Sequence, residues 1–212
     1  MNLACRDCPR LAAHLDRVRQ SHPEYHARPV SAFGDDHSRL LIVGLAPGMH
    51  GANRTGRPFT GDHAGVLLYS TLHAYGFASR PNSFSSDDGL VLQGCRITNA
   101  VKCLPPQNKP LSSEVKNCNR YLRAELETLP RDSVVLALGR VAHHAVLMTL
   151  DLRLSDYPFA HGAIHRLPHR ITLAASYHCS RYNTQTKRLS ENMFNDVFND
   201  ITTLLRESQC PM

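Results

Sequence analysis

Short apolar runs alternate along this chain with longer stretches that carry apolar residues at helical spacing. The runs suit strands buried on both faces of a sheet, and loops rich in glycine or proline separate them from the helical stretches. Strands that alternate with helices in this way predict an α/β fold with a parallel sheet covered on both faces. We expect strands at 40–43, 95–101, 134–138 and 171–176, and helices at 11–18, 63–75, 112–129, 139–150 and 190–206.

Three loops follow these strands, at 44–62, 99–110 and 177–188. The carboxyl ends of parallel strands meet at one edge of the sheet, which is where open α/β folds bind their ligands. The three loops together hold seven lysines and arginines but a single acid, Asp62. This distribution predicts a cleft that binds an anionic ligand.

Composition narrows the class of protein. A chain of 212 residues with 42% hydrophobic residues is expected to form one soluble domain. Its formal charge of +6 suggests an anionic partner. No apolar run is long enough to cross a membrane, and the first fifteen residues do not resemble an export signal, so we expect an intracellular protein with reduced thiols.

Seven cysteines are many for a protein that forms no disulfides. Cys5 and Cys8 form a C-x2-C pair, whereas Cys103 and Cys118 lie in a proline-rich loop and in the helix after it. Four thiolates from two distant segments predict a metal centre that ties the N-terminus to the body. Zinc and a [4Fe-4S] cluster both fit this ligand set, and buried ordinary thiols are the alternative. The remaining cysteines, Cys95, Cys179 and Cys210, are expected to be ordinary thiols.

Four side chains of the three loops could carry chemistry. Asp62 stands at the start of a predicted helix, where it can cap the helix or act on a ligand. Asn99 offers a carboxamide near the end of an apolar strand, Phe59 an aromatic face and His178 an imidazole. Each has an ordinary structural explanation, but together in a basic cleft they favour recognition of a planar polar ring attached to phosphate.

Four segments then carry a family resemblance. GLAPGMHGANRTGRPFTGD (44–62), ITNAVKCLPP (97–106), ALGR (137–140) and SYHCSRYNTQT (176–186) resemble the family 5 uracil-DNA glycosylases, relatives of the family 4 enzymes that carry an iron–sulfur cluster. The resemblance extends from Cys5 to about Leu205. The combination of the first two segments with the four cysteines is highly specific, whereas ALGR alone is not.

The resemblance implies a three-layer α/β/α sandwich with a central four-stranded parallel sheet. It implies one uracil-DNA glycosylase-like domain over residues 1–212, whose N-terminal segment a metal cluster ties to the body. Cys5, Cys8, Cys103 and Cys118 would ligate a structural [4Fe-4S] cluster. The protein would be a monomer in the cytoplasm, bound to the nucleoid through DNA.

The implied activity is removal of uracil, and of other deaminated bases such as hypoxanthine, from a nucleotide flipped out of DNA. Asp62 would stabilise the sugar cation or position water, and His178 would donate a hydrogen bond to the leaving base. The segments also imply two larger sets of contacts. The base would be held by Gly44, Ala46, Gly48, Phe59 and Asn99, and the DNA by Asn53, Arg54, Arg57, Lys102, Ser180, Arg181 and Asn183.

Two departures from the related patterns affect the mechanism. The first motif has Leu45 and Ala46 where family 4 carries an acid, so the chemical role falls to Asp62. The last motif reads His178-Cys179-Ser180 instead of His-Pro-Ser, which restores a backbone N–H after the histidine. The alternatives to a glycosylase are a catalytically silent nucleic-acid-binding protein of the same fold and a zinc-stabilised enzyme acting on free nucleotides.

Overall fold

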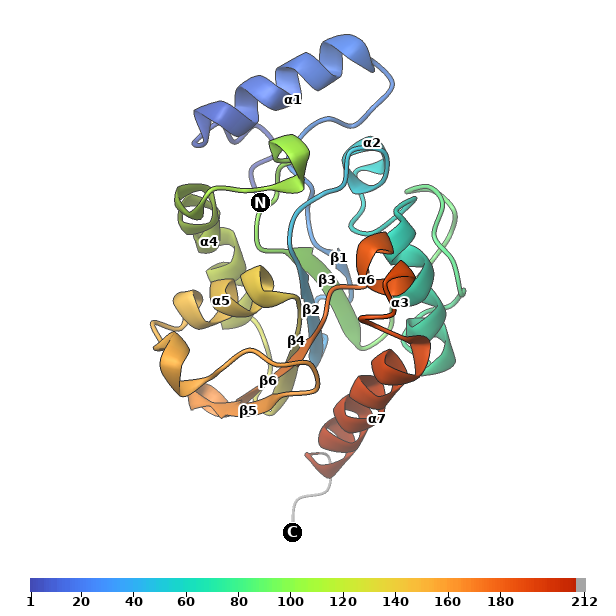
Figure 1. Cartoon of the computed structure of the whole chain (residues 1–212), viewed down its shortest axis with the longest axis vertical. Coiled ribbons are helices and arrows are strands. Elements are labelled where there is room, and N and C mark those ends of the chain that lie inside the picture. The colour runs from blue at the N-terminus through green and yellow to red at the C-terminus, as the bar shows by residue number, and fades with distance from the viewer. Residues whose placement is uncertain (209–212) are drawn as a thin grey trace.

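The centre of the fold is a mixed sheet of six strands, seen in a computed structural model that describes residues 1–208. Figure 1 shows this sheet in the middle of the molecule with helices on both sides. The strands follow the spatial order β1-β3-β2-β4-β6-β5. Their bounds are Phe33–Gly34 (β1), Leu40–Gly44 (β2), Cys95–Asn99 (β3), Ser133–Leu138 (β4), Ile164–Leu167 (β5) and Ile171–Ser176 (β6).

The four inner strands are the predicted ones, and they run parallel: β3 pairs with β2, β2 with β4, and β4 with β6. The two edge strands, β1 and β5, pair antiparallel and were not predicted. β1 has two residues inside a polar stretch, and most of β5 is exposed or half-buried, so neither carries the apolar run that marks an inner strand. The α/β sandwich and its parallel core are confirmed, and the sheet is wider by two antiparallel edges.

Two helical layers cover the sheet, with α3 and α7 on one face and α4 and α5 on the other (Figure 1). Strand β2 serves both cores in alternation, because Leu40 and Ile42 face the first layer while Leu41 and Val43 face the second. The covering helices are His63–Ala74 (α3), Ser112–Glu127 (α4), Arg140–Thr149 (α5) and Glu191–Glu207 (α7).

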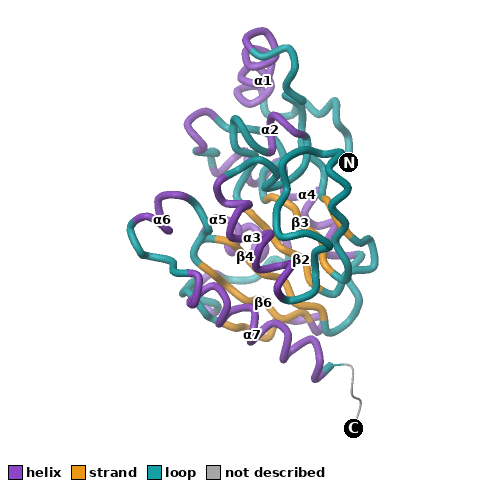
Figure 2. Tube along the Cα trace, turned by 90° about the vertical axis from the view of Figure 1, so that its right-hand side faces the viewer, coloured by secondary structure: helices purple, strands orange, loops and turns teal. Residues whose placement is uncertain are grey.

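Three further helices lie outside these layers. Helix α1, Pro9–Ser21, lies beyond the end of the sheet at the top of Figure 1. The short helices α2, Ala52–Thr55, and α6, Arg181–Gln185, interrupt the loops that follow β2 and β6, and Figure 2 shows the α6 segment projecting from the body. Single 3-10 turns occupy Pro106–Asn108, Leu154–Asp156 and Pro168–Arg170. Within residues 1–208 no helix combines the length and apolarity that a membrane span requires.

Candidate active site

The loops that follow β2, β3, β4 and β6 enclose a cavity of about 440 Å³ at one end of the sheet. This volume lies within the range of small-molecule sites, and its position is the one expected for an open parallel sheet. Its walls contain eight of the predicted site residues: Ala46, Gly48, Phe59, Asp62, Asn99, His178, Ser180 and Arg181. Loops more than 100 residues apart in sequence therefore meet around one space.

Asn99 and Phe59 are placed together by a glycine. A Cβ on Gly44 would overlap with Asn99 Oδ1 and would lie 2.7 Å from Phe59 Cζ, so only glycine leaves room for both groups. Asn99 is 2% exposed and borders the cavity. Its carboxamide can therefore offer a donor and an acceptor to a ligand in that space. Gly44 itself does not line the cavity, but its lack of a side chain allows Asn99 and Phe59 to pack there.

Asp62 occupies the N-cap position of α3, but its side chain does not cap that helix. The carboxylate turns toward the loop before α2, where Oδ2 accepts a hydrogen bond of 3.1 Å from the backbone N–H of Ala52. A Cβ on either Gly48 or Gly51 would overlap with this carboxylate. The simple helix-cap explanation of Asp62 is thus excluded, because two glycines seat the acid against the cavity instead.

The protonation of Asp62 is set by opposing effects. Burial raises the pKa of this carboxyl, while the Ala52 N–H and the nearby Arg54 and His50 lower it. The net direction is upward, because burial outweighs these three effects. Asp62 is the single carboxylate that borders the cavity among residues 1–208.

His178 is half-buried and lines the cavity. Burial lowers its pKa to about 4, so the imidazole is neutral at physiological pH. Its ring lies offset and nearly parallel to that of Phe59, with centroids 5.9 Å apart. Nδ1 is buried without a hydrogen-bond partner within residues 1–208. A buried lone pair costs less than a buried unpaired N–H, which favours the tautomer with its proton on Nε2.

Sequence comparison identifies the family to which this cavity belongs. The model of the uracil DNA glycosylase superfamily matches residues 31–202, a range that contains every residue lining the cavity. The chain belongs to the uracil-DNA glycosylase superfamily. The predicted family resemblance is therefore confirmed.

Individual relatives place this superfamily member near the type-5 proteins. The type-5 uracil-DNA glycosylase of Thermus thermophilus is 51% identical over 199 residues, covering 92% of this chain and 90% of the relative. That of Pyrobaculum aerophilum is 41% identical over 197 residues, covering 91% and 85%. The type-4 uracil-DNA glycosylase of Archaeoglobus fulgidus is 29% identical over 174 residues, covering 79% of each chain.

Three residues predicted to contact DNA in this uracil-DNA glycosylase superfamily member are buried inside it. Arg57 is 5% exposed and forms an ion pair of 2.6 Å with Asp88. Lys102 is 1% exposed and pairs with Glu125 at 3.0 Å. Asn53 is fully buried in α2. This placement corrects the prediction, because none of the three side chains can reach a phosphate at the surface.

The basic character of the cleft therefore depends on fewer cations than expected. Arg54 and Arg181 are exposed, and Arg181 lines the cavity. Ser180 begins α6 as its N-cap. Asn183 supports the site from behind, since its Nδ2 donates a hydrogen bond of 2.7 Å to the carbonyl of His178. Ser180 and Asn183 thus hold the loop that carries His178 in place.

The cavity also contains residues that the sequence analysis did not select. Leu138, Gly139, Arg140 and Val141 line it at the end of β4 and the start of α5, and exposed Tyr182 follows Arg181 on α6. The strand-end rule could have found the first group, because ALGR (137–140) spans the end of a predicted strand. The other lining residues are Leu45, His63, Ala64 and Asn108.

The four cysteines predicted as metal ligands line a second, smaller cavity between α1, α4 and the loop after β3. Three of their sulfurs accept weak hydrogen bonds: Cys118 from the Lys102 backbone N–H at 3.2 Å, Cys8 from Asn117 at 3.8 Å and Cys5 from Arg120 at 3.7 Å. Cys95 and Cys179 are buried elsewhere, as expected for ordinary thiols, and Cys210 lies outside the described residues.

The thiol pocket is defined by Cys5, Cys8, Cys103 and Cys118, which offer four sulfur donors. Four sulfurs from two distant segments face one space, and N–H groups directed at sulfur stabilise thiolate ligands. Across residues 1–208, no three histidine, cysteine or acidic side chains are arranged to hold a single metal ion. The four sulfurs that line this pocket are of the ligand type that zinc and iron–sulfur clusters both take.

Proposed function

We propose that this superfamily member removes uracil, and other deaminated bases such as hypoxanthine, from DNA and leaves an abasic site. The observation that carries the proposal is the cavity itself, where one carboxylate, one carboxamide and one neutral imidazole border a space the size of a small ligand. A base inside a duplex cannot reach such a cavity, so its nucleotide must first leave the stack.

Asn99 is the group suited to read the base. Its carboxamide has both a donor and an acceptor, and a uracil edge offers the complementary pair. Leu45, Ala46 and Gly48 leave the rest of that wall without a charged side chain. A wall with one reading group and little other polar chemistry supports acceptance of more than one deaminated base.

His178 is suited to stabilise the leaving base. When the N-glycosidic bond breaks, its electrons stay with the base, which becomes anionic. A neutral imidazole with its proton on Nε2 can donate a hydrogen bond to that charge. Its lowered pKa supports this role, because the donor remains available across neutral pH.

Asp62 is suited to act on the sugar side of the bond. The sugar gains positive charge as the base departs, and water then adds to the anomeric carbon. A carboxylate fixed by the Ala52 N–H can stabilise this charge or accept a proton from the water. A raised pKa brings the carboxyl closer to the range in which it can serve as a base.

DNA contact is assigned to the surface around the cavity. Arg54 and Arg181 are exposed cations, Arg181 lines the cavity, and the α6 segment projects beyond the body (Figure 2). Tyr182, on the same segment, is 69% exposed. We place α6 against the groove at the lesion, where Tyr182 can stack in the space that the extruded base leaves.

The thiol pocket is assigned to a [4Fe-4S] cluster held by Cys5, Cys8, Cys103 and Cys118. When bound, the cluster supplies a structural tie rather than redox chemistry on the base. Cys103 follows the strand that ends in Asn99, so ordering the cysteine loop also orders the end of β3. Arg120 and Asn117 on α4 direct N–H groups at two of the sulfurs.

A panel of duplexes tests the proposal. Each duplex contains one uracil, hypoxanthine, xanthine or ethenocytosine, and abasic product is measured with enzyme in excess. We expect strand cleavage after alkali for uracil and for hypoxanthine. Tight, salt-dependent binding without abasic product on any duplex would contradict the proposal and establish a silent binding protein.

A further inference from the structure

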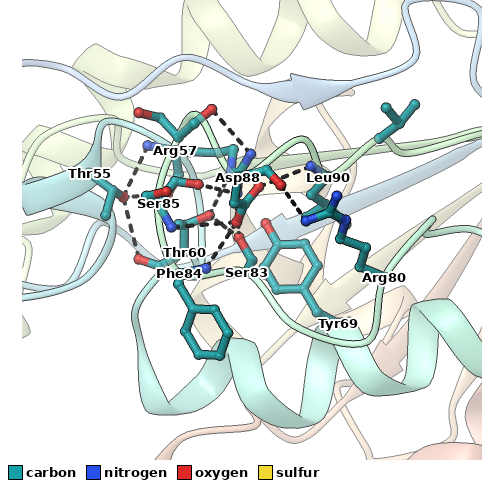
Figure 3. Close-up of polar contacts among 12 residues, drawn as sticks. Thr55, Arg57, Thr60, Tyr69, Arg80, Ser83, Phe84, Ser85, Asp88 and Leu90 are labelled. Carbon is teal, nitrogen blue, oxygen red and sulfur yellow. Dashed lines mark hydrogen bonds and ion pairs between the residues drawn. The ribbon is translucent and has the colours of Figure 1, made fainter.

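The Arg57 guanidinium is the centre of a buried polar network that no catalytic step uses (Figure 3). Nε donates to Thr60 Oγ1 at 2.8 Å, and one terminal nitrogen donates to Ser83 Oγ at 2.7 Å and to Asp88 Oδ2 at 2.6 Å. The same group bonds to the carbonyl of Ser85 and lies 4.7 Å from the centre of the Phe33 ring. Its donors face inward, so the side chain is committed to the protein.

Asp88 completes the network from the other side. Its carboxylate accepts hydrogen bonds from the backbone N–H groups of Phe84 and Leu90, both at 3.0 Å, and of Ser85 at 3.4 Å. Burial opposes its ionisation, but Arg57 and these N–H groups outweigh burial and hold its pKa at about 2. The turn at 83–88 is therefore tied to Arg57 by a fully ionised pair at any ordinary pH.

This turn fastens the loop that carries two site residues. Ser83 contacts the loop twice, since its hydroxyl lies 2.6 Å from that of Thr60 and its carbonyl accepts from the Gly61 N–H at 3.0 Å. Tyr69 adds a third bond, from its hydroxyl to the Pro58 carbonyl at 2.7 Å. The bonded positions, Pro58, Thr60 and Gly61, lie on both sides of Phe59 and directly before Asp62, and these last two residues line the cavity.

Phe59 needs such support because of its backbone. Its φ is +58°, a left-handed conformation that a bulky residue adopts only where the surroundings determine it. Its carbonyl lies so close to Gly65 that a Cβ there would overlap with it. Without the bonds on either side, this segment would relax toward ordinary backbone angles and carry the aromatic ring away from His178.

We propose that Arg57 and Asp88 are positioning residues, whose ion pair holds the 57–62 loop so that Phe59 and Asp62 meet the substrate in reactive geometry. The proposal rests on the proposed excision of a flipped base. It gives Arg57, which the sequence presents as a phosphate contact, a role inside the protein.

Three variants test the proposal. Asp88→Asn removes the charge while keeping the shape, so Arg57 loses its partner. The double variant Arg57→Met with Asp88→Leu replaces the pair by apolar groups, a change that can preserve folding but deletes the bonds to Thr60 and Ser83. Ile201→Ala in α7 removes apolar contacts from the core that α3 and α7 share but alters none of the network's hydrogen bonds, so it is the control for lost stability alone.

The measurement is the single-turnover rate of uracil excision and the affinity for uracil duplex, taken where all variants are folded. We expect both network variants to lose about 10- to 100-fold in rate with little change in affinity, since small misplacements of reacting groups cost this much. Ile201→Ala should match Asp88→Asn in its loss of melting temperature but keep its rate.

Two results separate this proposal from the proposed function. If the wild-type protein excises uracil and the double variant excises it at the same rate, the positioning role is refuted. If Asp88→Asn loses no more rate than Ile201→Ala, the pair is merely structural, which also overturns the proposal. A wild-type protein that leaves no abasic product instead refutes the excision activity, before any variant is compared.

Discussion

The base cavity, which Asp62, Asn99 and His178 border, differs from the thiol pocket in how far its polar groups are already hydrogen-bonded by the protein. Both combine residues from segments far apart in the chain. In the base cavity, His178 Nδ1 is buried without a hydrogen-bond partner within residues 1–208, and the Asn99 carboxamide borders the open space. In the thiol pocket, three of four sulfurs already accept N–H groups.

This difference indicates two kinds of ligand. Polar groups left without protein partners cost free energy until something binds them, which suits a substrate that comes and goes. Sulfurs supplied with donors in advance suit a resident group that needs its charge stabilised permanently. The comparison predicts that changes in the first site remove chemistry and that changes in the second remove stability.

The largest expected effect is that of Asp62→Asn. The amide keeps the shape of the side chain but cannot stabilise positive charge or accept a proton from water. We expect the single-turnover rate of uracil excision to fall about 10²- to 10⁴-fold. Affinity for the duplex and the melting temperature should change little, and a variant that retains its rate would show that the carboxylate has no chemical role.

Cys118→Ala should produce the opposite pattern. Removing one ligand of a structural metal group removes part of the folding free energy, so the protein should lose iron, visible absorption and several kcal/mol of stability. Cys95→Ala is the matched control, because Cys95 is also a buried cysteine but lies outside the thiol pocket. Equal iron content and equal unfolding midpoints in the two variants would contradict the assignment of the pocket.

His178 should make stability depend on pH. The unfolded side chain binds a proton below about pH 6.5. The folded one does so only below about pH 4. Between these values the unfolded state holds more protons, so stability falls as the pH falls. Once both states are protonated, this difference in the pKa of His178 has lowered the free energy of unfolding by about 3 kcal/mol. Denaturant titrations of wild type and His178→Asn should diverge across this window, and parallel curves would contradict a buried neutral imidazole.

The smallest effect separates a surface cation from a buried one. Arg181→Ala should reduce the slope of log affinity against log salt by about 1, because one phosphate contact is lost. The Arg57→Met, Asp88→Leu variant should keep the wild-type slope. If the two variants change the slope equally, Arg57 contacts DNA after all.

Much of this fold can be predicted from the sequence, because the inner strands carry continuous apolar runs. Strands β2, β4 and β6 end within about one residue of their predicted limits. The edge strands could not be predicted, since β1 is two residues long and β5 is mostly exposed or half-buried. Pairing at an edge depends on a neighbour that the local sequence does not reveal.

Site residues could be predicted where their position at a strand end brings them to the cavity. They were harder to predict where the direction of a loop side chain determines whether it faces the cavity or the protein interior. Asn99 ends β3 and His178 follows β6, and both line the cavity as expected. Arg57 and Lys102 lie in the same loops, yet their partners, Asp88 and Glu125, come from segments outside these loops. A count of charges within the loops could not reveal those ion pairs, so the basic character of the cleft was overestimated.

The most direct test of the account is the pH dependence of the single-turnover rate of uracil excision by the wild-type protein. The account places the chemistry on an ionised Asp62, whose pKa burial raises, beside a His178 that is already neutral. The rate should therefore rise from acid pH through an apparent pKa above the ordinary carboxyl value of about 3.9. This limb should vanish in Asp62→Asn and persist in His178→Asn. A limb that persists in Asp62→Asn and vanishes in His178→Asn would contradict the account.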